Sequence, residues 1–434
     1  MFSPCALLLL LLGVCLWDAY ILPCAVLPVL CLFCGRRGGY SAAFDEDEDD
    51  NDKGAQDARE RRRVDTMRTV VLVTGAARQE GIGYHIARGF LDHGCNVILF
   101  DINAEALRHA ERALDPSGQL TQWRKRFGDI DSCDSCDIND QFLMSVVCDV
   151  SDPEAVRKAK MQIQSAAPIS SRIHLQRQNY LQRKKAGTNP QIVSFEPRIV
   201  DILVQNAGVV TGKSLCELSP DETHRTLSVN LSSHFYGLRM FLPAMIAHDR
   251  GFIVTVASMM GHIGGAHLAP YCAAKWGLLG LDECLRMELR RSGTTGVRTM
   301  AVCPYVVSTG MFSGAFIDSD GNRSNKCSAN NTWLRRLVHL VRENLIPALT
   351  AESVASDIVY ETITRHKSSS WHARCSCGAR GSVLVLPRRM ALAPALVRFL
   401  PIGVQEWILD LLGGVHGMDG FHGHRHYDDC KKEM

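Results

Sequence analysis

The sequence has almost no excess of charge of either sign. Its 434 residues include 48 Lys and Arg and 46 Asp and Glu, which gives a formal net charge of +2. Because proteins that bind nucleic acids carry a basic patch or stripe, this balance gives no reason to expect a nucleic-acid partner. With 46% hydrophobic and 22% charged residues, the composition is that of an ordinary globular protein with one large domain or two smaller ones.

The 17 cysteines lack the arrangement of a disulfide framework or of a zinc site. They are scattered and odd in number, and several lie within apolar segments, as Cys303 does. We therefore expect them to be mostly reduced and to behave as small hydrophobic side chains. The pairs Cys133/Cys136 and Cys375/Cys377 have no histidine pattern that would complete a zinc site, so no metal is predicted.

The apolar N-terminus lacks two features of a secretory signal peptide. No basic residue precedes it and no small-x-small cleavage site follows it. We predict that residues 1–37 form a membrane anchor rather than a core helix, since a core helix would stand apart from the domain. Arg36-Arg37 then places the following chain in the cytosol. Asp18, Pro23 and Pro28 leave a single span, a bent span and a re-entrant hairpin open.

The charge pattern divides the rest of the chain. Residues 38–67 hold an acidic block, a basic block and few apolar residues, which is typical of a disordered tether. Residues 68–390 are predicted to form the folded domain, with polar surface-loop inserts near 115–140 and 168–197. Residues 391–434 hold an apolar helical stretch and a tail, and that stretch either packs on the core or contacts a membrane.

The start of the folded domain has the order of elements that a dinucleotide site requires. A strand over residues 69–73 is followed by a glycine-rich turn, Thr74 to Gly83, and by a helical pattern. Glycines let the backbone approach a pyrophosphate, and the helix N-terminus offers free amides. A second strand, 96–100, ends at Asp101, whose carboxylate can bind the adenosine ribose and repels a 2′-phosphate. This favours NAD as the cofactor.

Strands and helices alternate along the remainder of the domain. Helical patterns occupy 104–114, the segment from Pro153, and the segments that carry Asn230 and Tyr271, and the further strands are at 145–148, 199–204, 251–257, 297–303 and 383–386. This alternation predicts an α/β fold with a doubly wound, mainly parallel sheet.

Two residues on one predicted helix have the spacing of a proton-transfer site. Tyr271 and Lys275 are four residues apart and share a helix face, where the ammonium would lower the pKa of the phenol. A tyrosine that acts near neutral pH needs such help, because its ordinary pKa is about 10. Ser258 follows a buried strand, at the end where open α/β sheets bind ligands. The Tyr-x-x-x-Lys spacing alone is common, so its meaning depends on the other motifs.

Together these motifs resemble the classical short-chain dehydrogenase/reductase family. The resemblance covers about residues 68–309 and rests on the glycine-rich turn, Asn206-Ala207-Gly208, Asn230, Ser258 and the Tyr271–Lys275 pair. It implies a seven-stranded Rossmann-like sheet and an NAD(P)-dependent oxidoreductase. Softer motifs at the N-terminus and in the tail resemble the membrane-bound branch that contains retinol dehydrogenase 10, epidermal retinol dehydrogenase 2 and 17-beta-hydroxysteroid dehydrogenase 11.

The resemblance also implies a role for each matching residue. Tyr271 would be the general acid/base, and Lys275 would lower its pKa and bind the nicotinamide ribose. Ser258 would hold the reacting oxygen, and Asn230 would hold a water in the proton relay. The remaining cofactor contacts would come from Gly75, Gly81, Ile82 and Gly83 at the pyrophosphate, Asp101 at the adenosine ribose, Asp149 and Val150 at the adenine, Asn206, Ala207 and Gly208 at the neighbouring ribose, and Pro304 and Thr309 at the nicotinamide end.

Three features depart from the family pattern. Five residues rather than three separate Gly75 and Gly81, and Tyr305 stands where the family usually has the glycine of a Pro-Gly pair. Arg78 lies in the glycine-rich turn, where a basic residue favours the NADP phosphate and opposes Asp101. Asp101 has the better-defined position, so NAD is the expected cofactor and NADPH-dependent carbonyl reduction is the alternative.

The expected reaction interconverts a lipophilic alcohol, retinol or steroid-like, with its carbonyl. The anchor supports this substrate class, since such alcohols concentrate in bilayers, and it suggests an endoplasmic-reticulum membrane or a lipid droplet, with the catalytic domain facing the cytosol. The resemblance also implies a homodimer, for which the residues give no independent sign. The alternative is a protein that is not an enzyme and keeps this fold as a catalytically idle scaffold. The altered glycine-rich turn supports it, and the presence of all four catalytic residues opposes it.

Overall fold

The computed structural model describes residues 69–121, 141–185, 197–312, 349–367, 381–388 and 400–411, together with Met418 and Phe421. The chain divides into two compact units, Met1–Ala58 and Arg59–Met434, and every described residue belongs to the second. The predicted anchor, the tether, most of the first insert and both cysteine pairs lie outside the described residues. The six cysteines within them are all free.

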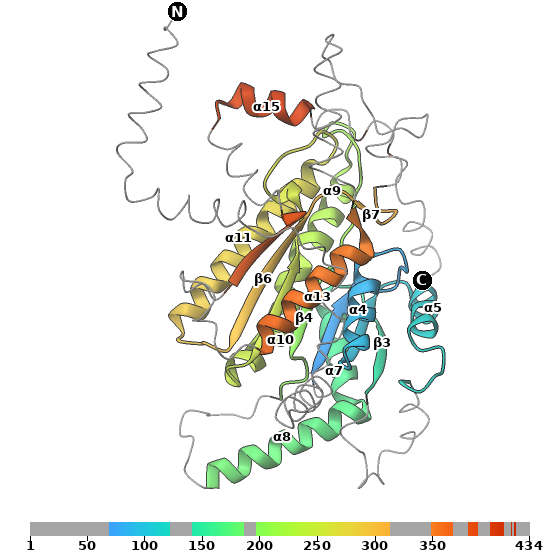
Figure 1. Cartoon of the computed structure of the whole chain (residues 1–434), viewed down its shortest axis with the longest axis vertical. Helices are drawn as coiled ribbons and strands as arrows, with labels where there is room; N and C mark the ends of the chain where they lie inside the picture. The colour runs from blue at the N-terminus through green and yellow to red at the C-terminus, as the bar shows by residue number, and fades with distance from the viewer. Residues whose placement is uncertain are drawn as a thin grey trace, which may run out of the picture. The chain divides into compact units, whose positions relative to one another are not determined.

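Seven parallel strands form the central sheet, as predicted (Figure 1). They are β1 (Val70–Thr74), β2 (Asn96–Asp101), β3 (Leu143–Val147), β4 (Ile202–Gln205), β5 (Gly251–Val256), β6 (Val297–Pro304) and β9 (Gly381–Leu386). Their order is β3-β2-β1-β4-β5-β6-β9, and every neighbouring pair is parallel. The chain moves outward from β1 to β3 and then returns to place β4 beside β1. Such a switch point is where open parallel sheets bind ligands at the carboxyl ends of their strands.

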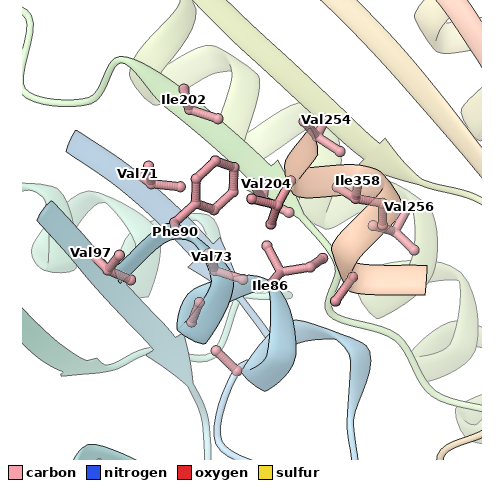
Figure 2. Packing of buried hydrophobic residues seen from close by; sticks show 14 of the residues in the cluster. Val71, Val73, Ile86, Phe90, Val97, Ile202, Val204, Val254, Val256 and Ile358 are labelled. Atoms are coloured by element: carbon pink, nitrogen blue, oxygen red, sulfur yellow. The ribbon is translucent and has the colours of Figure 1, made fainter. Parts of the chain in front are cut away.

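Helices cover both faces of the sheet, which explains why its strands are apolar without alternation. On one face pack α4 (Ile82–Asp92), α5 (Ala104–Leu114) and α13 (Ala351–Lys367), and on the other pack α7 (Pro153–Ser165), α10 (Ser233–Ala247) and α11 (Ala269–Arg291). Figure 2 shows the first of these clusters, where strand valines such as Val71 and Val73 meet Ile86 and Phe90 of α4 and Ile358 of α13. Val70 and Leu72 belong to the opposite cluster, because successive side chains of a strand point to opposite faces.

The second insert is not a loop over most of its length, so this expectation was wrong. Residues Ala167–Lys185 form a helix, α8. The segment has no apolar period, but it is rich in Arg, Gln, Leu and Lys, which favour helix, and contains no glycine. Its first part contacts the domain closely, where Ile169 is buried and Arg172 reaches an aspartate.

The remaining elements surround the carboxyl edge of the sheet. They are α9 (Pro220–Leu227), a π-helical turn (Ser228–Ser232), a 3-10 turn (Met259–Gly261), a two-stranded sheet of β7 (Val307–Ser308) and β8 (Leu349–Thr350), and α15 (Ile402–Leu411). The small sheet was not predicted. Of the predicted apolar stretch that begins at 391, only residues from 400 onward are described. Within the described ranges, no helix combines the length and the hydropathy of a bilayer span.

Candidate active site

A cleft of about 440 Å³ lies at the carboxyl edge of the sheet and gathers residues from across the sequence. Of the sixteen predicted site residues, all but two line it. The two exceptions, Gly83 and Asn230, are buried behind its wall. The lining residues are Gly75, Gly81, Ile82, Asp101, Asp149, Val150, Asn206, Ala207, Gly208, Ser258, Tyr271, Lys275, Pro304 and Thr309.

The glycine-rich turn packs closely against α4 and against the segment that follows β4. Gly75 has a φ of +66°, and a Cβ atom at Gly83 would lie 2.3 Å from the carbonyl oxygen of Gly75. The Asn206 side-chain amide donates hydrogen bonds to the carbonyls of Thr74 at 3.0 Å and of Gly75 at 3.1 Å. Asn206 therefore fastens the turn to β4, a positioning role in addition to the ribose contact that the resemblance implies.

The N-terminus of α4 is free to bind an anion. Gly81 stands at its N-cap with no side-chain capping bond, and there is no acidic residue in the first turn. The Gly81 amide donates to the Arg78 carbonyl at 2.9 Å. Gly81 and Ile82 line the cleft, so the first turn of the helix and the positive end of its dipole face it. These residues fit the pyrophosphate of a dinucleotide.

Asp101 and Arg78 lie at the same end of the cleft. The Asp101 carboxylate accepts hydrogen bonds from the backbone amides of Ala77 at 3.0 Å and Asn103 at 3.1 Å. Burial raises the pKa of Asp101, and these amides and the nearby charge of Arg78 offset part of that rise. The carboxylate is thus held in place by the backbone, while the basic side chain adjoins it.

Three polar side chains meet in the buried wall of the cleft. Ser258 caps the turn after β5 and is 8% exposed, and Tyr271 and Lys275 in the first turns of α11 are 5% and 3% exposed. Tyr271 shares a hydrogen bond with Ser258. The Nζ atom of Lys275 donates to the carbonyl of Val256 at 2.8 Å and lies 5.6 Å from the centre of the Tyr271 ring.

The expected effect of Lys275 on the tyrosine is not observed. Burial raises the pKa of Tyr271 above its ordinary value of 10.0, and the hydrogen bond with Ser258 offsets only part of the rise. Burial also lowers the pKa of Lys275 to about 8. The lysine is bonded to a main-chain carbonyl, and burial is the largest cause of both pKa shifts. In this state Tyr271 is a protonated phenol, a group that can donate a proton.

Asn230 and His234 support this wall from behind. The Asn230 side chain donates to the carbonyls of Val209 and Thr226, both at 2.8 Å, and accepts from the Val209 amide at 3.1 Å. Its amide group is therefore engaged in positioning the loop after β4. Sequence reasoning missed His234, which is 1% exposed. Burial, and secondly the charge of Lys275, lowers its pKa to about 3, so its ring is neutral.

The other end of the cleft is apolar. The Phe312 ring packs edge-on against Tyr271 with ring centres 5.8 Å apart, and Val210 and Met311 line the same end. No motif marks Val210 in the sequence, and only its position after the Asn-Ala-Gly segment could have pointed to it. Across the described parts of the chain, no group of three His, Cys, Asp or Glu residues is arranged to hold a metal.

Comparison with known proteins agrees with this geometry. A family model described as short chain dehydrogenase (adh_short) matches residues 144–319. Retinol dehydrogenase 10-B of Danio rerio is 32% identical over 255 residues, which cover 57% of this chain and 64% of that protein. Over residues 144–319 the chain is similar to the short-chain dehydrogenases. The residues matched by the family model include Ser258, Tyr271 and Lys275, whereas the atypical glycine-rich turn lies before them.

Two further proteins show how far the family resemblance extends. Epidermal retinol dehydrogenase 2 of Homo sapiens is 27% identical over 352 residues, or 81% of this chain and 84% of that protein. A short-chain dehydrogenase/reductase from Burkholderia phymatum, solved in complex with NAD, has a TM-score of 0.50 at 20% identity and covers 76% of this chain and 92% of its own. This structure supports the fold. The chain spans about two thirds, 64%, of the retinol dehydrogenase 10 proteins that it matches.

Proposed function

We propose that the chain is an NAD(H)-dependent oxidoreductase that interconverts a lipophilic alcohol, a retinoid or steroid-like one, with its carbonyl at a membrane. One observation carries the proposal: the hydrogen-bonded Ser258–Tyr271 pair with Lys275 beside it lies in the same cleft as the free N-terminus of α4. A binding scaffold needs no buried proton donor next to a dinucleotide site. The retinol dehydrogenases among the relatives support the substrate class.

The chain's own residues would bind the cofactor and move one proton. The chemistry that a bound nicotinamide supplies is hydride exchange with an alcohol or carbonyl carbon. Gly81, Ile82 and the end of α4 would hold its pyrophosphate, and Asp101 the adenosine ribose. Ser258 would hold the reacting oxygen of the substrate. Tyr271 would donate its proton to a carbonyl oxygen, or accept one from an alcohol once its phenol is ionised.

The anchor completes the proposal physically. Residues 1–37 would hold the enzyme at an endoplasmic-reticulum membrane or a lipid droplet, residues 38–67 would form a tether, and the catalytic domain would face the cytosol. Residues 391–434 would add a second apolar contact. Lipophilic alcohols concentrate in bilayers, so an anchored cleft is close to its substrate. A homodimer is the assembly that the family suggests.

Reduction of a carbonyl with NADPH is the second candidate. The proximity of Arg78 to Asp101 favours it, because a guanidinium can pair with a 2′-phosphate. The protonated state of Tyr271 favours it as well, since a phenol is the form that donates to a carbonyl.

The test is turnover by membranes that contain the full chain. All-trans-retinol with NAD or NADP, and the corresponding aldehyde with NADH or NADPH, would be compared for the wild type and for Tyr271→Phe. We expect oxidation with NAD and a loss of about a thousandfold in the variant. Tyr84→Phe, which changes a buried tyrosine outside the cleft, should retain activity. Preference for NADPH would establish the reductase instead.

A catalytically idle scaffold is distinguished by nucleotide binding. A ligand present at a hundred times its dissociation constant stabilises the folded state by about 2.7 kcal/mol. We therefore expect NAD to raise the midpoint of thermal denaturation by several degrees. No turnover together with no shift from either nucleotide would overturn the proposed function.

A further inference from the structure

Two described residues from the C-terminal part of the sequence, Met418 and Phe421, pack in the apolar cluster around Tyr271. Tyr271 belongs to a buried cluster with Val210, Leu268, Cys272 and Met418. Met418 is only 4% exposed, and the Phe421 amide donates to its carbonyl at 3.0 Å. Phe421 packs on the same cluster. Two residues more than 140 positions away in sequence thus contact the surroundings of the catalytic tyrosine.

The Phe421 ring lies directly on the main chain of Gly212. A Cβ atom at Gly212 would lie 2.0 Å from Cδ1 of Phe421 and 2.2 Å from Cε1. Atoms cannot approach this closely, so any other residue at 212 must displace the ring. Gly212 also has a φ of +70°, a conformation that glycine adopts without strain. Both features indicate that a glycine at 212 is what allows the Phe421 ring to lie in this position.

The loop that carries Gly212 has two sides. Val209, Val210, Thr211 and Lys213 line the cleft, whereas Gly212 meets Phe421. Val210 also belongs to the cluster with Met418, so this loop contacts the surroundings of Met418 through Val210 and Phe421 through Gly212. The contact thus connects Phe421 to the loop that lines the cleft.

We propose that Met418 and Phe421 back the substrate end and that Phe421, acting through Gly212, is a positioning residue that selects long apolar substrates over short ones. This proposal rests on the proposed oxidoreductase function. Phe421 does not line the cleft itself, so its effect is on the shape of the apolar end and not on the proton transfer at Tyr271.

The first experiment compares a long alcohol with a short one of the same chemistry. All-trans-retinol and 3-methyl-2-buten-1-ol are both primary allylic alcohols, but only the first is long enough to extend along the apolar end. In Phe421→Ala, the ratio of kcat/KM for the long alcohol to that for the short one should fall about tenfold, a size typical of altered apolar pocket contacts. The change should appear in KM for retinol, with kcat for the short alcohol within about twofold. Phe421→Leu should show a smaller fall.

A double-variant comparison tests the contact itself. Gly212→Ala should reproduce the loss of selectivity, because its methyl group displaces the ring. In the Phe421→Ala background the same change should add little, since the ring is absent. Gly293→Ala is the matched control: Gly293 has a φ of +73°, and a Cβ atom there meets nothing within 4 Å. It carries the backbone strain without the clash and should leave the selectivity unchanged.

A binding readout separates this proposal from the proposed function. Retinol added to the full chain in detergent micelles should raise the midpoint of thermal denaturation of the wild type, and Phe421→Ala should reduce this shift. If no variant oxidises an alcohol but the shift still depends on Phe421, the role of Phe421 in binding is supported and the proposed reaction is wrong. Equal losses for both alcohols, an unchanged ratio in Phe421→Ala, or no retinol shift in the wild type would each contradict the proposal that Phe421 shapes the substrate end.

Discussion

At the amino-terminal edge of the sheet, the carboxylate of Asp201 is 2% exposed and fully paired. It lies 2.6 Å from Nη2 of Arg172 and 3.0 Å from Nε of Arg198, and it accepts a hydrogen bond from the Val70 amide at 2.9 Å. Burial alone would raise the pKa of Asp201, but the two arginines hold it at about 2. This charged group joins α8 to the starts of β1 and β4.

At the carboxyl-terminal edge, buried ionisable groups are left without such compensation. Lys275 has no carboxylate partner among the described residues, and its ammonium is bonded to the Val256 carbonyl. Burial raises the pKa of Tyr271 and lowers that of Lys275, so burial disfavours the charged form of both groups. The amino-terminal edge thus buries a charge within a stabilising network. The carboxyl-terminal edge instead buries ionisable side chains without an ion pair, at the place where the proposed proton transfer requires them.

Breaking the amino-edge network should have the largest effect on stability. Asp201→Asn removes the negative charge and leaves Arg172 and Arg198 facing each other, which should lower the free energy of unfolding by about 3 kcal/mol. Urea denaturation would measure it. Asp282→Asn is the matched control, because Asp282 is also 2% exposed but burial raises its pKa, so a neutral side chain should be tolerated better. Equal losses in the two variants would contradict a special role for the network.

The pH dependence of stability should show the same network. The folded-state pKa of Asp201 is held at about 2, below its ordinary value of 3.8, so its contribution is complete above pH 4 and is lost as the pH falls toward 2. This difference corresponds to about 2.5 kcal/mol. The difference in stability between the wild type and Asp201→Asn should therefore shrink over this range. A difference that is constant from pH 4 to pH 2 would show that Asp201 acts by packing alone.

The sequence predicted the sheet well because both faces of each strand are covered. Continuous apolar runs such as residues 69–73 mark buried parallel strands, and the glycine-rich turn fixed the direction of the first crossover. The seven-stranded parallel sheet was confirmed. The helix α8 was missed because no apolar period marks its residues. Residue propensity, rather than periodicity, was the available signal there.

The site was predicted as a set of residues but not as a set of interactions. Fourteen of the sixteen residues line one cleft, because motifs at strand ends meet at one edge of the sheet. The pKa of Tyr271 was predicted in the wrong direction, since helix spacing brings Lys275 near the ring but does not reveal that the phenol is buried, which raises its pKa. The contact of Phe421 with Gly212 joins distant parts of the chain and has no local signal.

The last prediction concerns the carboxyl edge, where a substitution should raise rather than lower the free energy of unfolding. Because burial lowers the pKa of Lys275 from 10.5 to about 8, its charged form destabilises the fold at pH 7. Lys275→Met removes that charge and one hydrogen bond, with a net gain of about 1 kcal/mol in the free energy of unfolding, while turnover is lost. The wild-type protein gains stability as the pH rises from 8 to 10.5, so the advantage of the variant should disappear there. Lys158→Met, at an exposed position on α7, should change neither stability nor turnover. A Lys275→Met variant that is less stable at pH 7 would mean that the two edges bury charge in the same way.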